Sequence, residues 1–126
     1  MVKTIVQTHA APSPIGPYSQ AVRFGDILFL SGQIALNPET GNLTESAIEV
    51  QTRQVMENLK AVLMEAGMDF SHVIKSTIFL TDLQDFPEVN TVYGAYFEDK
   101  FPARETIEVS GLPKGADVEI SMIAGY

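Results

Sequence analysis

The predicted strands of this 126-residue chain are apolar on both faces, while only two predicted helices are available to cover them. Successive side chains of a strand point to opposite faces of its sheet. Ile27 and Phe29 alternate with Leu28 and Leu30, and Val73 and Phe79 alternate with Ile74 and Ile78. A sheet built from such strands needs a layer on each side, because a large exposed apolar patch is costly.

Turn residues and apolar periodicity divide the chain into strands and two helices within one domain, residues 1–126. We expect strands at residues 3–7, 21–24, 27–33, 73–80, 106–109 and 118–124. The first helix is expected over residues 46–66, with a capping box at Ser46 and Glu49 and a stop at Gly67. The second is expected to begin at Asp85, its cap, with Pro87 in the first turn. The predicted fold class is α+β, with a mixed sheet of about six strands.

The number of helices limits how the sheet can be covered. Five or six strands at ~4.8 Å spacing make a sheet roughly 24–29 Å wide, whereas two helices of ~10 Å diameter cover about 20 Å. The two helices therefore suffice for one face. We expect other copies of the chain to cover the second face in a closed homo-oligomer. The alternative is a twisted sheet that partly curls on itself.

Charge and composition exclude several classes of protein. Eight Lys and Arg residues, scattered singly, stand against sixteen Asp and Glu, for a net charge of -8. Nucleic-acid binding needs clustered basic residues, so we do not expect it. The absence of cysteine excludes disulfides, thiolate zinc sites and a thiol nucleophile. We see no signal peptide in Met1–Gly16 and no apolar run of membrane-spanning length, so a cytoplasmic domain without a membrane contact is expected.

Common catalytic and cofactor motifs do not occur in the sequence. It has no Gly-rich phosphate loop, no His pair at metal-ligand spacing and no Gly-x-Ser-x-Gly elbow. His9 and His72 are the only imidazoles, and their places before a loop and a strand indicate surface residues without a catalytic role. We therefore expect no metal and no cofactor.

Two charged residues at strands are the main candidates for chemistry. Arg104 follows Phe101-Pro102-Ala103, and it serves either in an internal salt bridge or as the anchor of a carboxylate ligand. Glu119 shares a strand face with Ser121 and lies opposite Val118. It is either a solvated edge residue or a carboxyl group whose pKa rises on burial between subunits. Hydroxyl, backbone and amide contacts could come from Tyr18, Ser31, Gly32 and Asn90.

Taken together, five ordered segments resemble the Rid (YjgF) family of reactive-intermediate imine and enamine deaminases. They are residues 15–21 (Ile-Gly-Pro-Tyr-Ser-Gln-Ala), 31–34 (Ser-Gly-Gln-Ile), 89–93 (Val-Asn-Thr-Val-Tyr), 101–104 (Phe-Pro-Ala-Arg) and 112–120 (Leu-Pro-Lys-Gly-Ala-Asp-Val-Glu-Ile). The resemblance runs from near Thr4 to about Ala124. It implies a chorismate-mutase-like α+β fold and a homotrimer with active sites between subunits.

The resemblance also implies roles for individual residues. Arg104 would hold the substrate carboxylate and Glu119 would position the hydrolytic water, with Tyr18 as a third catalytic residue. Ser31, Gly32, Asn90 and Thr106 would complete the substrate-binding wall. The implied reaction is hydrolysis of 2-imino acids, such as 2-iminopropanoate and 2-iminobutanoate, to 2-oxo acids and ammonia without a cofactor.

One departure and two alternatives accompany the resemblance. Arg104 is followed by Glu105-Thr106, where many imine deaminases carry Ser, another residue and often Cys, which puts the substrate range in question. Thr106 shares strand parity with Arg104, whereas Glu105 points to the opposite face. A non-catalytic trimer that binds 2-oxo acids and signals to a partner is the main alternative function. Nuclease or translation-inhibitor activity, also described for this family, is disfavoured by the charge of -8.

Overall fold

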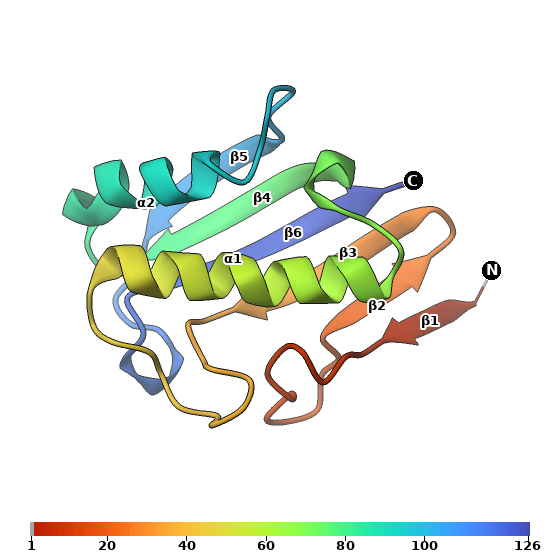
Figure 1. Cartoon of the computed structure of the whole chain (residues 1–126), viewed down its shortest axis with the longest axis horizontal. Coiled ribbons are helices and arrows are strands. Elements are labelled where there is room, and N and C mark those ends of the chain that lie inside the picture. Colours follow the sequence, from red (N-terminus) through yellow and green to blue (C-terminus); the bar gives the residue numbers. More distant parts are fainter. Residues whose placement is uncertain (1) are drawn as a thin grey trace.

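The computed structural model describes residues 2–126, which form one six-stranded sheet with two helices on one of its faces (Figure 1). The strands are β1 (Lys3–Val6), β2 (Ala21–Phe24), β3 (Ile27–Gln33), β4 (Val73–Leu80), β5 (Ala103–Glu108) and β6 (Val118–Gly125). The helices are α1 (Ile48–Glu65) and α2 (Phe86–Gly94), with short 3-10 turns η1 (Phe70–His72), η2 (Leu83–Asp85) and η3 (Pro113–Gly115). The α+β fold class is confirmed.

The order of strands in the sheet is β1-β2-β3-β6-β4-β5, and only β4 and β5 run parallel. The last strand of the chain, β6, thus lies between β3 and β4. The predicted hairpin of β2 and β3 is confirmed. The loop of residues 109–117 carries the chain past β4 from the edge strand β5 to β6, so β5 keeps one unpaired edge.

Helix α1 packs its apolar stripe onto the middle of the sheet. Val55, Leu59 and Leu63 are fully buried, and the helix contacts β3 and β6. Gly67, at φ 73°, follows its C-terminus as expected, because glycine adopts this conformation without strain. The predicted capping box at Ser46 is wrong: Ala47 occupies the cap position without a side-chain bond. Gln51 holds the start of the helix instead, since its amide donates to Ser46 O (3.2 Å) and Asp117 Oδ2 (2.8 Å).

The start of α2 differs from the expectation in its cap. Asp85 makes no side-chain capping bond, and Asp82 instead accepts from Gln84 N (2.9 Å) to cap the preceding turn η2. Pro87 lies in the first helical turn as expected. The side-chain cap at this point therefore comes from Asp82, ahead of η2, and not from the predicted Asp85.

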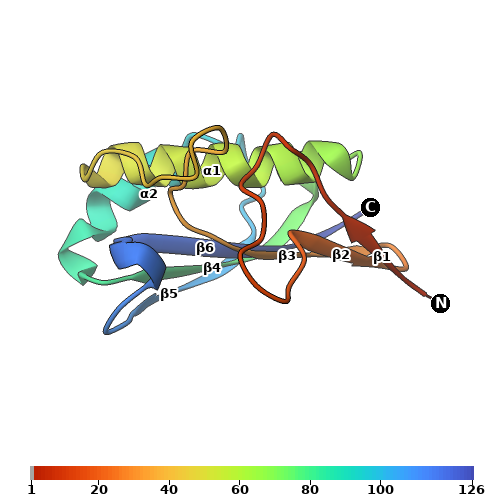
Figure 2. The same ribbon diagram turned by 90° about the horizontal axis from the view of Figure 1, so that it is seen from below.

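The sheet has one covered and one uncovered face in this chain (Figure 2). On the covered face Leu28, Ile78 and Ile120 have no solvent exposure. On the other face Phe29 is 49% exposed and Ile107 is 44% exposed. The prediction that both faces of the sheet carry apolar side chains is confirmed. Within residues 2–126 of one chain, no layer covers the second of these faces.

Two strand details correct the sequence interpretation. The register of β4 shifts between Val73 and Lys75, so buried Val73 lies on the same face as Ile78 rather than opposite it. Strand β5 begins at Ala103 instead of residue 106, because its first residues pair with β4. Arg104 therefore stands within an edge strand and not before it.

Candidate functional site

The first group of candidate residues surrounds a cavity of about 430 Å³ at one end of β3 and β6. Its charged lining residues are Lys114 and Glu119, and Tyr18, Ser31 and Gly32 are among its other lining residues. Apolar side chains, among them Ile15 and Leu36, line the rest. We call this group the glutamate half-site. The structure brings together four residues predicted from sequence, Tyr18, Ser31, Gly32 and Glu119.

The Pro-rich loop before β2 is fastened to this half-site by a buried amide. Gln20 is 1% exposed and its Nε2 donates to three carbonyl oxygens, those of Thr8, Ala11 and Pro12. Its Oε1 accepts from Thr8 N (2.7 Å). Ser31 Oγ donates to Ser19 O (2.6 Å) beside it. Sequence reasoning missed Gln20. A side-chain amide after a proline-rich segment is nevertheless a usable signal, because proline has no backbone N–H and such a segment depends on side chains for its hydrogen bonds.

Gly32 is required by the position of the Glu119 side chain. A Cβ atom at position 32 would lie 2.9 Å from Glu119 Cδ, well inside van der Waals contact. The strand register is irregular at this point, between Leu30 and Gln33, which turns Gly32 toward β6. The glycine therefore makes room for the carboxylate.

Glu119 is a half-buried carboxyl group on the uncovered face, since Val118 and Ile120 beside it are buried under the helices. Burial raises the pKa of Glu119 above its ordinary value of 4.5, and no neighbouring charge opposes the shift. A raised pKa brings the group closer to the range in which a carboxyl group exchanges protons near neutral pH.

The second group of candidate residues lies between β5 and α2, and we call it the arginine half-site. Arg104 Nη1 donates to Asn90 Oδ1 (2.7 Å). Its guanidinium carbon lies 5.4 Å from the centre of the Phe86 ring and 5.3 Å from that of Tyr93. Within residues 2–126 Arg104 forms no ion pair, so the internal salt bridge considered above is absent. A guanidinium held by neutral groups keeps its charge available for an anion.

The neighbours of Arg104 on β5 follow the predicted alternation. Thr106 shares its face, and the Thr106 hydroxyl oxygen is buried without a hydrogen-bond partner in the described chain. Glu105 points to the uncovered face, where it contacts Lys75 Nζ (3.2 Å) and accepts from Thr77 Oγ1 (3.1 Å). These two contacts hold the pKa of Glu105 below its usual value. Glu105 therefore stays away from the guanidinium.

The two half-sites do not meet within one chain. Arg104 lies on the covered side, where its guanidinium contacts side chains of α2, whereas Glu119 points to the uncovered face. Through the β4 register Glu119 is level with Ile107, three residues along from Arg104, and two strand spacings separate β6 from β5. The Cα atoms are therefore about 14 Å apart. A ligand of three or four carbons cannot touch both side chains in one protomer.

Other parts of the molecule offer weaker candidates. His72 Nδ1 accepts from Asp69 N (3.1 Å) and closes a local cap. Nowhere in residues 2–126 do three metal-ligating side chains cluster, and no helix of that range is long and apolar enough to cross a membrane. These findings leave the two half-sites as the main candidates.

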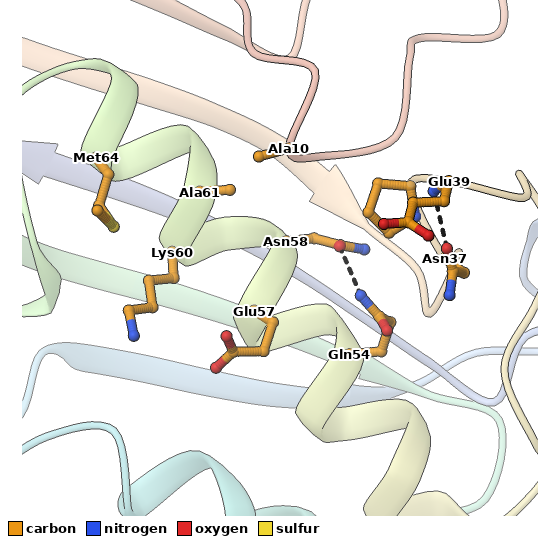
Figure 3. Close-up of a pocket in the computed structure, with 10 residues that line it drawn as sticks. Ala10, Asn37, Glu39, Gln54, Glu57, Asn58, Lys60, Ala61 and Met64 are labelled. Atoms are coloured by element: carbon orange, nitrogen blue, oxygen red, sulfur yellow. Dashed lines mark hydrogen bonds between the residues drawn. The ribbon is translucent and has the colours of Figure 1, made fainter.

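A larger hollow of about 560 Å³ on the outer side of α1 is drawn in Figure 3. None of the predicted site residues lines it. Several of its polar groups bond within the protein: Gln54 donates to Asn58 (2.9 Å), and Glu57 accepts from Tyr96 (2.7 Å). We therefore do not consider this hollow a candidate functional site.

The observed fold and half-sites define an α+β protein whose sheet has one open face and whose candidate polar site is split between two places. A family model described as "Endoribonuclease L-PSP" matches residues 8–126, nearly the whole chain. The chain belongs to this family, the Rid or YjgF family.

Relatives and solved structures agree with this assignment. "Protein DfrA" of Myxococcus xanthus is 53% identical over 98% of this chain and 96% of its own length. "Reactive Intermediate Deaminase A, chloroplastic" of Arabidopsis thaliana is 46% identical over 97% of this chain and 65% of its own length.

A Rid-family protein of Yersinia pestis, YyfA, superposes with a TM-score of 0.97 at 53% identity, covering 99% of this chain and 100% of that one. Escherichia coli TdcF, solved with bound serine, gives 0.94 at 40% identity and covers 98% of both chains. The resemblance read from the five segments is thus confirmed at the level of family and fold.

Proposed function

We propose that the protein hydrolyses 2-imino acids to 2-oxo acids and ammonia at sites formed between copies of the chain in a homotrimer. The observation that carries the proposal is the Arg104 guanidinium, which is oriented by neutral groups and not neutralised. The deaminase name of the Arabidopsis relative and the amino acid bound to TdcF support a small substrate with a carboxylate.

The separation of the half-sites supports an assembly. Each half-site holds one charged residue that the reaction needs, and about 14 Å of sheet separates them in one chain. Packing the uncovered face of one copy against the β5 edge of the next could bring an arginine half-site to a glutamate half-site. The exposed apolar side chains Phe29, Ile74 and Ile107 would be buried by the same contact.

The reaction needs a positioned electrophile and a positioned water. Arg104 would hold the substrate carboxylate in a bidentate pair, with Asn90 and Thr106 beside it. A protonated imine carbon is already electrophilic, and Glu119 would orient a water toward it and accept a proton as the C–O bond forms. The resulting carbinolamine loses ammonia as the C=O bond forms, so imine and water give 2-oxo acid and ammonia. Tyr18 and Ser31 would contact the reacting groups from the cavity wall.

The first test removes the guanidinium. Arg104→Ala should lower kcat/KM for 2-iminopropanoate, generated in situ from an amino acid. The expected loss of transition-state stabilisation is about 2–5 kcal/mol. Arg53→Ala, on the exposed side of α1, is the matched control and should keep full activity. Unchanged turnover by the Arg104 variant would remove the anchor from the proposal. A trimer that binds 2-oxobutanoate but hydrolyses no imine would favour the regulatory alternative.

The second test asks whether a site uses two copies. Arg104→Ala and Glu119→Gln chains are each expected to be impaired, and co-refolded mixtures would combine an intact arginine half-site with an intact glutamate half-site. Random mixing of equal amounts should restore about a quarter of the wild-type activity. Activity no higher than that of the separate variants would contradict a site shared between copies.

The family description as an endoribonuclease gives a competing activity. The glutamate half-site cavity has a single basic lining residue, Lys114, in a chain of net charge -8. Phosphate neutralisation, the main source of affinity for RNA, would be weak there. Salt-dependent RNA binding or cleavage at physiological ionic strength would revive this activity.

A further inference from the structure

The guanidinium of Arg104 lies near two aromatic rings that come from one face of α2. Phe86, Asn90 and Tyr93 are spaced four and three residues apart, so they follow one another along the same side of the helix. Both ring centres are within 6 Å of the guanidinium carbon, the range of a cation–π contact. Asn90, which lies between Phe86 and Tyr93 along the helix, accepts the hydrogen bond from Nη1.

Tyr93 is itself held by a buried hydrogen bond. Its ring is 3% exposed, and its hydroxyl donates to Ser76 Oγ (2.9 Å), which is fully buried. Ser76 pairs directly with Arg104 in the register of β4 and β5. The Arg104 backbone is therefore paired with Ser76, Ser76 bonds to Tyr93, and the Tyr93 ring contacts the Arg104 guanidinium.

We propose that Tyr93, fixed by Ser76, is a positioning residue that holds the Arg104 side chain in the orientation that receives a planar carboxylate. The inference rests on the proposed function, in which Arg104 binds the substrate. A free arginine side chain has many rotamers, and a ligand that orders it loses affinity. An acidic partner would also order the side chain, but it would occupy the N–H groups that the carboxylate needs. Rings and an amide provide order without neutralising the charge.

Two variants of the protein separate the role of the Tyr93 ring from that of its hydroxyl. Tyr93→Leu removes the ring beside the guanidinium, so KM for 2-iminopropanoate and Kd for 2-oxobutanoate should rise about tenfold while kcat changes less. Combining Tyr93→Phe with Ser76→Ala removes both hydroxyls and leaves no buried polar atom unpaired. This pair should raise both constants about threefold, because the ring remains but is less firmly held.

The matched control is Tyr96→Leu. Tyr96 belongs to the same aromatic cluster, where its ring centre lies 5.3 Å from that of Phe70, and no contact joins it to Arg104. It should leave KM unchanged. If Tyr93→Leu does not fold, Phe86→Leu removes the other ring from a half-exposed position and should produce the same rise in KM. Equal KM values in the Tyr93 or Phe86 variants and the wild type would overturn the inference.

A spectroscopic measurement distinguishes this inference from the proposed function. In protein labelled with 15N-arginine, the Arg104 side-chain signals, assigned with Arg104→Lys, should show slow rotation of the guanidinium in the wild type. Tyr93→Leu should accelerate that rotation, and Tyr96→Leu should not. If the wild type hydrolyses no imine but shows this difference, the proposed function fails and the positioning role stands. If the wild type is active and Tyr93→Leu leaves the rotation unchanged, the positioning role fails alone.

Discussion

The two faces of the sheet are built from the same strands but differ in their exposure to solvent. Leu28 and Phe29 are neighbours on β3, yet Leu28 has no exposure and Phe29 is 49% exposed. The helices decide the difference: both lie on one side of the sheet (Figure 2), and Leu28 is buried on that side. An apolar side chain alone therefore does not make a core, because a second layer must be present to bury it.

The same comparison applies to the polar residues. On the covered side the arginine half-site is ordered by α2, whereas on the uncovered face Glu119 is only half buried and Lys75 pairs with Glu105 near water. The two half-sites thus differ in what surrounds them. In the arginine half-site the charged side chain has partners within the chain, whereas in the glutamate half-site the carboxyl group faces whatever covers that face.

Substitutions at adjacent positions of β3 should give the largest contrast. Leu28→Ala should lower the free energy of unfolding by about 2–5 kcal/mol, because it opens a cavity between the sheet and α1. Phe29→Ala should cost less than about 1 kcal/mol in a dilute, dissociated chain, since its side chain is half exposed there. Urea unfolding at several protein concentrations measures both. Equal losses at low concentration would show that the two faces are not energetically distinct in one chain.

Concentration then sharpens the contrast. If copies cover the uncovered face, Phe29→Ala should weaken assembly, so it should lower the unfolding midpoint more at high protein concentration, where the wild type is assembled, than at low concentration, where both proteins are dissociated. Sedimentation of the wild type as a stable monomer at micromolar concentration would contradict the covering copies.

The next largest effect is expected from substitution of Gly32, with Gly94 as the control. Gly32→Ala places a methyl group against Glu119, so the carboxylate should rotate away and activity should fall at least about tenfold. Because Glu119 can move, the free energy of unfolding should change by less than about 1 kcal/mol. Gly94→Ala is the control: a Cβ there meets nothing within 4 Å, so rate and stability should be kept. Full activity of the Gly32 variant would show that the position of Glu119 does not matter.

Short-range patterns predicted most of the fold. The hairpin over β2 and β3 depends on adjacent residues and a two-residue turn, and the end of α1 depends on Gly67 alone. The missed features depend on partners far along the chain. Pairing with β4 moves the start of β5 to Ala103, and Gln51 replaces the expected Ser46 cap by reaching Asp117.

The candidate site was predicted in its residues more than in its arrangement. Strand alternation placed Glu119 on the face opposite Val118 and placed Thr106 with Arg104, as the structure shows. Alternation within a strand does not show which face of the sheet the helices cover. The placement of Arg104 and Glu119 on opposite faces was therefore not predicted from their spacing. The catalytic and binding roles of these residues stay predictions until the variants above are measured.

The smallest expected effect concerns the charge of Glu119 on the uncovered face. Since burial raises its pKa in the folded chain, protonated Glu119 favours folding. That contribution is full below the unfolded pKa near 4.5 and is lost as pH rises through the higher folded pKa. In a dilute, dissociated chain Glu119→Gln, which carries no charge, should therefore be more stable than the wild type at pH 7.5, by less than about 1 kcal/mol because water still reaches the carboxyl group. Thermal unfolding at pH 4 and pH 7.5 measures this, and the advantage should shrink at pH 4. A less stable variant in the dissociated chain would contradict the raised pKa of Glu119. In the assembled protein the advantage of the variant should shrink or reverse, because the proposed function places the guanidinium of another copy beside Glu119.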